Sequence, residues 1–278
     1  MTPARAPDQG VILINVLVIL ALSSTILFAM LRLSDAAISR SQRFSDAAQG
    51  VALLDAGEVT GIAALRRDMQ AAPQADFPGE DWASIGQEEI AIAGGTFSLA
   101  IMDATGKFNL TNVVFGGPET LPFLQKILDE LALSDTARLQ LLTRLANPAP
   151  LTAMDDLRAS GLSPADIRQL STLVTVLPNP TAINLNTMPD AMFNVLAGNP
   201  VQARLLQGLR ARRGQIAPSD LLDAGLIPAV RVAVTSDIYT VTTHAMIGDV
   251  RQARESLLVR SVAPTGPQVI VVARRAVE

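Results

Sequence analysis

The sequence predicts an α+β protein in which a long N-terminal helix packs on an antiparallel sheet, with a large all-helical domain inserted between strands of that sheet. An apolar run over residues 11–31 passes into an amphipathic helix, strand patterns occur near both ends of the remaining chain, and helical patterns fill its middle. We expect five segments, at residues 1–10, 11–33, 34–106, 107–236 and 237–278.

Composition limits the classes of function open to the chain. Its 278 residues, 49% of them hydrophobic, are enough for a membrane helix and one or two compact domains. A net charge of −4 and a pI of about 5.1 give no overall basic field for nucleic acid. The absence of cysteine excludes disulfides, thiolate metal sites and cysteine nucleophiles. His244 is the single histidine, which removes most histidine-based catalysis and multi-histidine metal sites, and we assign this residue to a strand.

The apolar run has the length of a membrane-spanning helix, for which about 20 residues suffice. A short polar leader precedes it and ends in Gly10. Cleavage between Gly10 and Val11 would leave the apolar helix on the mature chain, whereas a secretory signal is removed together with its apolar core. Asn15 lies inside the run, either as an amide near the interface or as a polar contact with a neighbouring membrane helix.

The orientation of this helix is indicated by two opposing signals. Arg5 lies before the run, whereas Arg32, Arg40 and Arg43 follow it, so counting positive charges does not favour a cytoplasmic N-terminus. Processing of the leader at the cytoplasmic face, in contrast, requires a cytoplasmic N-terminus. We give the leader more weight and expect the C-terminal part outside the cytoplasm.

The helical pattern continues beyond the membrane. Gly50, Gly57 and Gly61 are expected to weaken it locally and permit a bend, and Pro73 is expected to end it. Apolar residues at spacings of three and four, or their sum, predict one buried stripe, formed by Phe44, Ala48, Val51, Leu54, Ile62, Leu65 and Met69.

Beyond a loop at 72–81, the pattern predicts a hairpin with strands at 89–92 and 96–102, joined at Gly94 and Gly95. Trp82 is expected to anchor the loop against the sheet. Further strands are predicted at 238–245, 255–262 and 268–274. Helices are predicted at 121–133, 135–146, 154–159, 164–175, 189–196, 201–212 and 219–224. Ser134 is expected to cap the second of these, at 135–146.

A leader ending in glycine, a long apolar and then amphipathic helix, and a small antiparallel sheet resemble the type IV pilins and pseudopilins. Two asparagine-rich segments narrow the match: TGKFNLTN at 105–112, and INLNTMP at 183–189 followed by Val195 and Leu196. Both resemble signatures of the general secretion pathway protein K family of type II secretion systems. The resemblance covers essentially the whole chain.

This resemblance implies a non-enzymatic minor pseudopilin. A prepilin peptidase would cut between Gly10 and Val11 and methylate the new N-terminus at Val11. Asn15 stands at the fifth mature position, where pseudopilins usually carry glutamate and K-type members characteristically do not. A subunit that caps the stack has no neighbour above it to pair with that carboxylate.

The resemblance also implies partners and location. The chain would start pseudopilus assembly at the tip with the minor pseudopilins I and J and, we expect, H. It would cross the inner membrane of a Gram-negative bacterium once, with its C-terminal part in the periplasm. The family is associated with calcium, and Asp103, Asn109 and Asn112 offer oxygen ligands, although their spacing assigns no ligand set.

Two alternatives stay open from the sequence. Residues 184–222 look like the helix-hairpin-helix unit of membrane-anchored DNA-uptake receptors, with a hairpin at 197–200. A basic patch would then consist of Arg204, Arg210, Arg212 and Arg213. The hairpin lacks a second glycine and Pro200 removes a donor, so a structural or protein-binding role is favoured and no nucleic acid is expected. The second alternative is an unrelated single-pass periplasmic scaffold.

Overall fold

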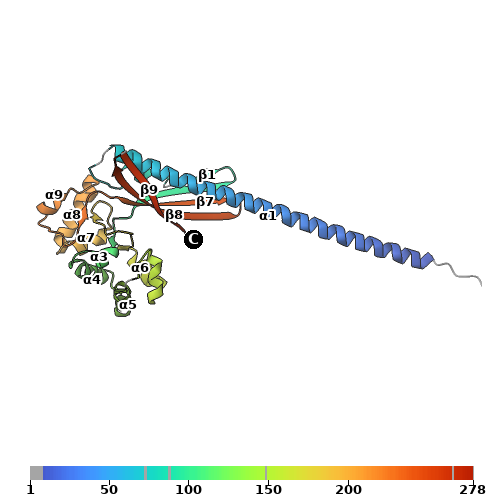
Figure 1. Ribbon diagram of the computed structural model, residues 1–278, viewed down its shortest axis with the longest axis horizontal. Helices are drawn as coiled ribbons and strands as arrows, with labels where there is room; N and C mark the ends of the chain where they lie inside the picture. The colour runs from blue at the N-terminus through green and yellow to red at the C-terminus, as the bar shows by residue number, and fades with distance from the viewer. Residues whose placement is uncertain (1–8, 72–73, 87–88, 148, 265, 278) are drawn as a thin grey trace, which may run out of the picture.

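A single long helix projects from a body that holds all other elements (Figure 1). The computed structural model describes residues 9–71, 74–86, 89–147, 149–264 and 266–277. Helix α1 (Gln9–Ala71) has 63 residues, which correspond to about 95 Å at 1.5 Å per residue. It includes both sides of the predicted cleavage point. The rest of the predicted leader, residues 1–8, and Pro73 lie outside the described residues.

The body contains one five-stranded sheet of order β1-β2-β7-β8-β9, with every neighbouring pair antiparallel. β2 pairs with β7, so the hairpin before the helical region and the meander after it form one continuous sheet. This is the predicted α+β arrangement. The strands are β1 (Ile90–Ile92), β2 (Gly95–Asp103), β7 (Ile238–Ile247), β8 (Val250–Ala263) and β9 (Gly266–Ala276).

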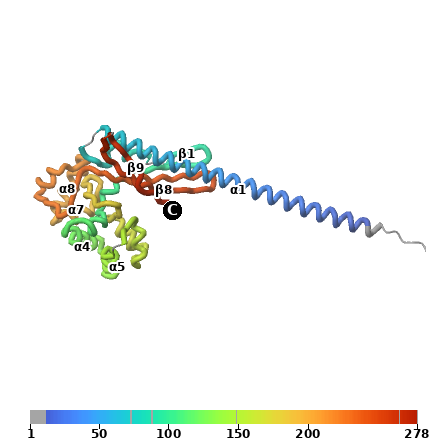
Figure 2. Tube along the Cα trace, viewed as in Figure 1, coloured from blue at the N-terminus to red at the C-terminus, as the bar shows by residue number. Residues whose placement is uncertain are grey.

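Short helices fill the chain between β2 and β7 and form a separate lobe, which we call the helical block (Figures 1 and 2). Its helices are α3 (Thr111–Phe115), α4 (Thr120–Glu130), α5 (Asp135–Leu145), the 3₁₀ helix η1 (Met154–Ser160), α6 (Pro164–Leu170), α7 (Asp190–Leu196), α8 (Pro200–Arg213) and α9 (Pro218–Asp223). The predicted cap of α5 is confirmed, because the Ser134 hydroxyl accepts from the Ala137 N–H at 3.3 Å.

Two parallel pairs of two-residue strands join the helices of the block, and none of these strands was among those predicted. They are β3 (Phe108–Asn109) with β4 (Val174–Thr175), and β5 (Ile183–Asn184) with β6 (Val232–Ala233). The helix predicted over 164–175 is therefore wrong beyond Leu170. Its last residues pair with β3 instead, because the β-branched Val174 and Thr175 suit a strand.

The sheet and the helical block have separate hydrophobic cores. In the sheet core, Trp82 from α2 (Asp81–Ser84) meets Tyr239 edge to face, with ring centroids 5.1 Å apart. The predicted anchoring role of Trp82 is thereby confirmed. Fully buried side chains of the block core include Phe108, Leu124, Ile127, Leu141, Leu170 and Phe193.

α1 packs on β7, β8 and β9 through its glycines. A Cβ added at Gly57 would lie 2.5 Å from Thr243 Oγ1, and one at Gly61 would lie 2.6 Å from Val241 Cγ2. The backbone of the helix therefore lies almost directly on the strand. α1 is continuous through these positions, and the missing side chains permit close packing; the predicted local weakening stays a prediction.

The predicted apolar stripe holds only in its second half. Leu54 and Leu65 are buried, but Phe44 is 78% exposed and Val51 is also exposed. The contacting face turns toward the glycines, so the first part of the stripe lies beside the sheet rather than beneath it. These residues remain available on the surface of α1.

The close contact predicts a large effect of a bulky side chain at Gly57. We expect Gly57→Leu to lower the free energy of unfolding by about 1–3 kcal/mol, since it overpacks the helix–sheet contact. Thermal unfolding of the full chain in detergent measures this. Ala56→Leu is the matched control, because Ala56 is exposed on the same turn. Equal melting temperatures for both variants would contradict the close-packing interpretation.

Candidate functional site

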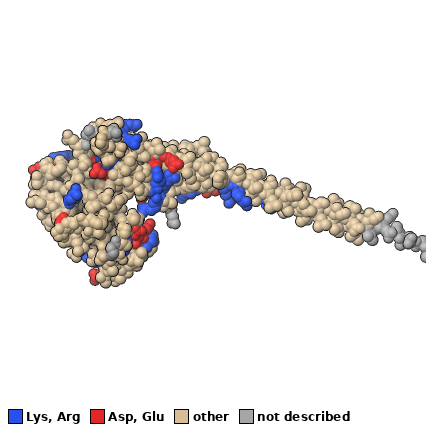
Figure 3. All heavy atoms as spheres, viewed as in Figure 1, with Lys and Arg blue, Asp and Glu red and all other residues tan. Residues whose placement is uncertain are grey.

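The candidate functional site is the part of α1 that the sheet leaves uncovered, which we call the outer face. In the N-terminal half of α1, large apolar side chains from Ile12 to Leu33 are exposed. This stretch is long and apolar enough to cross a membrane, by length and composition. Asn15 is exposed among these apolar residues. Figure 3 shows few charged atoms on this part of the helix and a basic group where it approaches the body.

The outer face continues alongside the sheet. Phe44, Val51 and Val59 are exposed there, Val59 to 63%. Between them lie exposed small residues at a recurring spacing of four, Ala48, Ala52 and Ala56. Small side chains permit another helix to approach closely, and large ones beside them supply apolar contact. The outer face can therefore pack against a second helix both inside and outside a membrane.

Buried charges hold the distal end of α1 to the body. Arg260, on β8, is 8% exposed and donates from Nη1 to Asp68 of α1 at 2.7 Å. Its Nη2 pairs with the fully buried Asp76, and its Nε donates to the Ser236 carbonyl at 2.6 Å. Burial raises the pKa of Asp68. Removing one member of such a group would leave an uncompensated buried charge.

A second charged contact lies nearer the middle of α1. Arg274 of β9 donates from Nε and Nη2 to the two carboxylate oxygens of Glu58, both at 2.7 Å. The Ser256 hydroxyl donates to the same carboxylate at 2.7 Å. The hydrogen bonds from Arg274 hold the pKa of Glu58 below its ordinary value of 4.5. Glu58 is therefore a charged anchor within the glycine-lined contact.

Asn109 and Asn112, in the asparagine-rich segment at 105–112, join separate turns of the helical block. Asn109 Oδ1 accepts from the N–H groups of Thr111 and Leu177, at 3.1 and 3.0 Å. Asn112 exchanges two hydrogen bonds with the backbone of Thr181, at 2.8 and 2.9 Å. Each amide therefore replaces a missing backbone partner at a chain crossing.

The second segment fixes the block to the sheet around Asp103. Asp103 Oδ1 accepts from the N–H and hydroxyl of Thr105, at 2.7 and 2.8 Å. Its Oδ2 accepts from Asn184 Nδ2 at 2.9 Å and from the hydroxyls of Thr187 and Ser236. The last residue of β2 thus contacts the chain near both β5 and β7. We call this group the junction network.

Calcium does not fit the oxygens that the sequence offered for it. The side-chain oxygens of Asp103, Asn109 and Asn112 already accept the hydrogen bonds just described, and none of these bonds joins one of the three to another. Among the described residues, Asp68, Asp76 and Glu80 form the one carboxylate group close enough to share a cation. Arg260 already pairs with two of them, so we assign no calcium ligand.

The predicted basic patch is divided by the structure. Arg210 pairs with Asp190, and Arg213 pairs with Asp220 at 2.8 Å. Only Arg204 and Arg212 point outward without an ion pair among the described residues. The hairpin is also unsuited to phosphate, because Asn199 Oδ1 already accepts from the N–H groups of Val201 and Gln202. The DNA-receptor alternative is therefore not supported.

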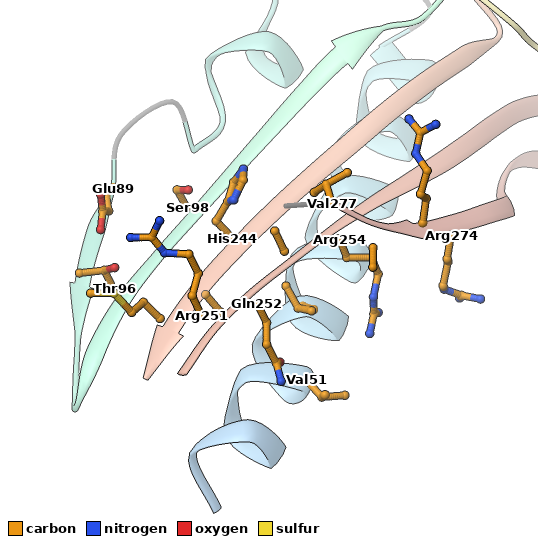
Figure 4. Close-up of a pocket in the computed structure, with 16 residues that line it drawn as sticks. Val51, Glu89, Thr96, Ser98, His244, Arg251, Gln252, Arg254, Arg274 and Val277 are labelled. Carbon is orange, nitrogen blue, oxygen red and sulfur yellow. The ribbon is translucent and has the colours of Figure 1, made fainter. Parts of the chain in front are cut away.

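The described residues that line an open groove at the end of the sheet form no catalytic set (Figure 4). His244 is exposed in β7 opposite Ser98, and its imidazole makes no hydrogen bond or ion pair among the described residues, as expected for an ordinary strand residue. Arg254 and Arg274, which also line the groove, pair with Asp55 and Glu58. The groove is thus mainly an extension of the contact between α1 and the sheet.

Sequence analysis missed the charged anchors Glu58, Asp68, Asp76 and Arg260. Two signals were present: Arg260 interrupts an otherwise apolar part of a strand, and Glu58 lies between Gly57 and Gly61 in a helix. An isolated charge in such a place often has a buried partner. The identity of that partner depends on the fold.

Comparison with known proteins adds a relative and a similar fold. No protein-family model matches the chain. Over 302 aligned residues it is 26% identical to the type II secretion system protein K of Pseudomonas aeruginosa, covering 92% of this chain and 90% of that protein. Its fold matches a chain in the crystal structure of the GspK-GspI-GspJ complex from the enterotoxigenic Escherichia coli type 2 secretion system. That match has a TM-score of 0.65 and 17% identity, covering 86% of this chain and 99% of the other.

The Arg274–Glu58 contact predicts a pH dependence of stability. Because the folded state lowers the pKa of Glu58, the contact stabilises the protein above about pH 4.5, and this contribution is lost as pH falls through the lowered pKa. We expect Arg274→Gln to reduce stability at pH 7 and to make stability less dependent on pH below 4.5. Denaturant unfolding of the full chain at pH 3–7 measures this.

The matched control is Arg275→Gln on the same strand, β9, which removes the pair with Glu255 of β8, a carboxylate more exposed than Glu58. The control should retain the pH profile of the original protein. A profile for Arg274→Gln that parallels the original at every pH would show that Glu58 is not the responsible group.

Proposed function

We propose, for this chain of the type II secretion system protein K family, that it starts pseudopilus assembly from the tip. It is a minor pseudopilin of type II secretion, a structural protein rather than an enzyme, anchored by its long apolar helix. The observation that carries the proposal is the uncovered outer face of α1. A structural subunit needs such a face to join its neighbours.

The outer face supports helix packing with the minor pseudopilins I and J, and with H. The structurally similar chain comes from a complex that contains GspI and GspJ. In this chain, exposed apolar and small residues continue from the N-terminal half of α1 to Val59, while the opposite face is occupied by the sheet. A neighbouring helix could therefore pack along most of α1 without displacing the body.

The position of the helical block supports a place at the tip. The block lies at the end of the body away from the N-terminus of α1 (Figure 1). A subunit with a lobe of this size would not fit repeatedly along a thin fibre, which favours a position at the tip. Asn15 agrees with a capping subunit, because an amide avoids the burial of a carboxylate in the bilayer, which costs about 2.5–3.5 kcal/mol on insertion scales. We therefore expect Asn15→Glu to impair assembly. Unchanged assembly would contradict the proposed role of Asn15 in a capping subunit.

The proposal includes insertion in a bacterial inner membrane, with the body in the periplasm and processing by a prepilin peptidase. On co-expression with that peptidase, intact mass and N-terminal sequencing should give a mature chain that begins at methylated Val11. Gly10→Val is the control and should keep residues 1–10. A native chain that still carries those residues would contradict the processing step.

The outer face predicts an assembly defect for a charge placed on it. Ala56→Arg should reduce co-purification with the I and J pseudopilins about tenfold or more, because a charge at the centre of a packed interface is expensive. Ala211→Arg is the matched control, since Ala211 is exposed on α8 in the helical block. Equal recovery of I and J with both variants would place the interface elsewhere.

A further inference from the structure

The end of the helical block exposes four large apolar side chains, which we call the distal patch: Val201, Leu205, Leu222 and Ile227. Their exposed fractions lie between 45% and 86%. Val201 and Leu205 stand one turn apart on α8, Leu222 lies on α9, and Ile227 follows α9. Contiguous exposed apolar residues on a folded domain usually mark an interaction surface.

The fold holds the two parts of the distal patch together. Gln202 Nε2 donates to the carbonyls of Ala224 and Gly225, at 3.0 and 3.2 Å. These bonds join the first turn of α8 to the end of α9. Ala203 and Leu206 of α8 are fully buried, so Val201 and Leu205 occupy the opposite side of the helix. The apolar residues are therefore fixed outward by the packing of the block.

Charge surrounds the distal patch on α8. Arg204 and Arg212 are exposed and have no ion pair among the residues that the structure describes, whereas Arg210 and Arg213 are paired. With Val201, Leu205 and Gly208 at spacings of three and four, they form one outward stripe. Asp223 is the exposed acidic residue of α9. The stripe itself is apolar and positive.

We infer that the distal patch binds a further protein whose surface presents apolar side chains beside carboxylates. Apolar residues of that partner would bury Val201, Leu205, Leu222 and Ile227, and its carboxylates would meet Arg204 and Arg212. α8 and α9 lie at the far end of the molecule from the N-terminus of α1 (Figure 1), so this partner differs from the pseudopilins expected along the outer face. The inference goes beyond the assembly role.

Secretion by cells that carry a complete type II system, with this chain supplied as the full-length protein, tests the inference. Leu222→Asp and the double variant Arg204→Glu/Arg212→Glu should each lower export about tenfold or more, because both oppose an acidic and apolar partner. The controls are Leu139→Asp and Lys126→Glu/Arg168→Glu. They make the same changes at exposed positions elsewhere on the block, Leu139 being 67% exposed.

Co-purification with the I and J pseudopilins separates this inference from the proposed assembly role. The distal-patch variants should retain I and J while export falls. Variants that lose I and J would assign the patch to that complex and overturn the inference, as would export equal to that of the controls.

A suppressor selection identifies the partner by its chemistry. Starting from Arg204→Glu/Arg212→Glu, mutations that restore export should replace an acidic residue with a basic one on the surface of another protein. That protein should then bind the double variant and bind the original chain less well. Suppressors confined to this chain, or to the I and J pseudopilins, would overturn the inference.

Discussion

The close packing of one face of α1 on the sheet is the contact on which the rest of the structure depends. At Gly57 and Gly61 the helix backbone lies directly on the Thr243 and Val241 side chains of β7; the anchor Glu58 lies between these glycines, and Asp68 lies beyond them. Glycines in a helix cost about 1 kcal/mol each relative to alanine. Here that cost is offset by burial, and one face of the helix carries the whole attachment. The other face remains uncovered for neighbours.

Polar contacts rather than apolar packing fix the helical block to the sheet. The block and the sheet have separate cores, so hydrophobic burial alone would permit several relative placements. Asp103, Asn184 and Ser236 come from three distant parts of the chain and must meet within hydrogen-bonding distance. Directional bonds of this kind select one arrangement. The two asparagine-rich segments are therefore structural elements of the junction and its neighbouring turns.

The sequence predicted the features that depend on neighbouring residues and missed those that depend on distant ones. Apolar periodicity was sufficient for α1, the five-stranded sheet and most helices, because each is encoded over ten or more residues or by a clear turn. The parallel pairs β3 with β4 and β5 with β6 were missed, since two residues have no measurable period. Arg260 and Asp68 are 192 residues apart, so their pairing followed only from the fold. The face of α1 that contacts the sheet was predicted incorrectly in its first half, because that face contains glycines, which are not counted as apolar in the periodicity.

Three groups of exposed apolar residues, on the first part of α1, on the outer face and in the distal patch, have different surroundings. Along the first part of α1 the exposed apolar surface is continuous around the helix, as a lipid environment requires. Along the outer face it is restricted to one side and mixed with small residues, which suits another helix. On α8 and α9 it lies beside Arg204 and Arg212, which have no ion pair among the described residues. This setting suits neither lipid nor a closely packed helix but does suit an acidic protein surface. A subunit that joins a fibre at one end and meets a different protein at the other would need this separation, because one uniform apolar surface could not distinguish the two kinds of partner.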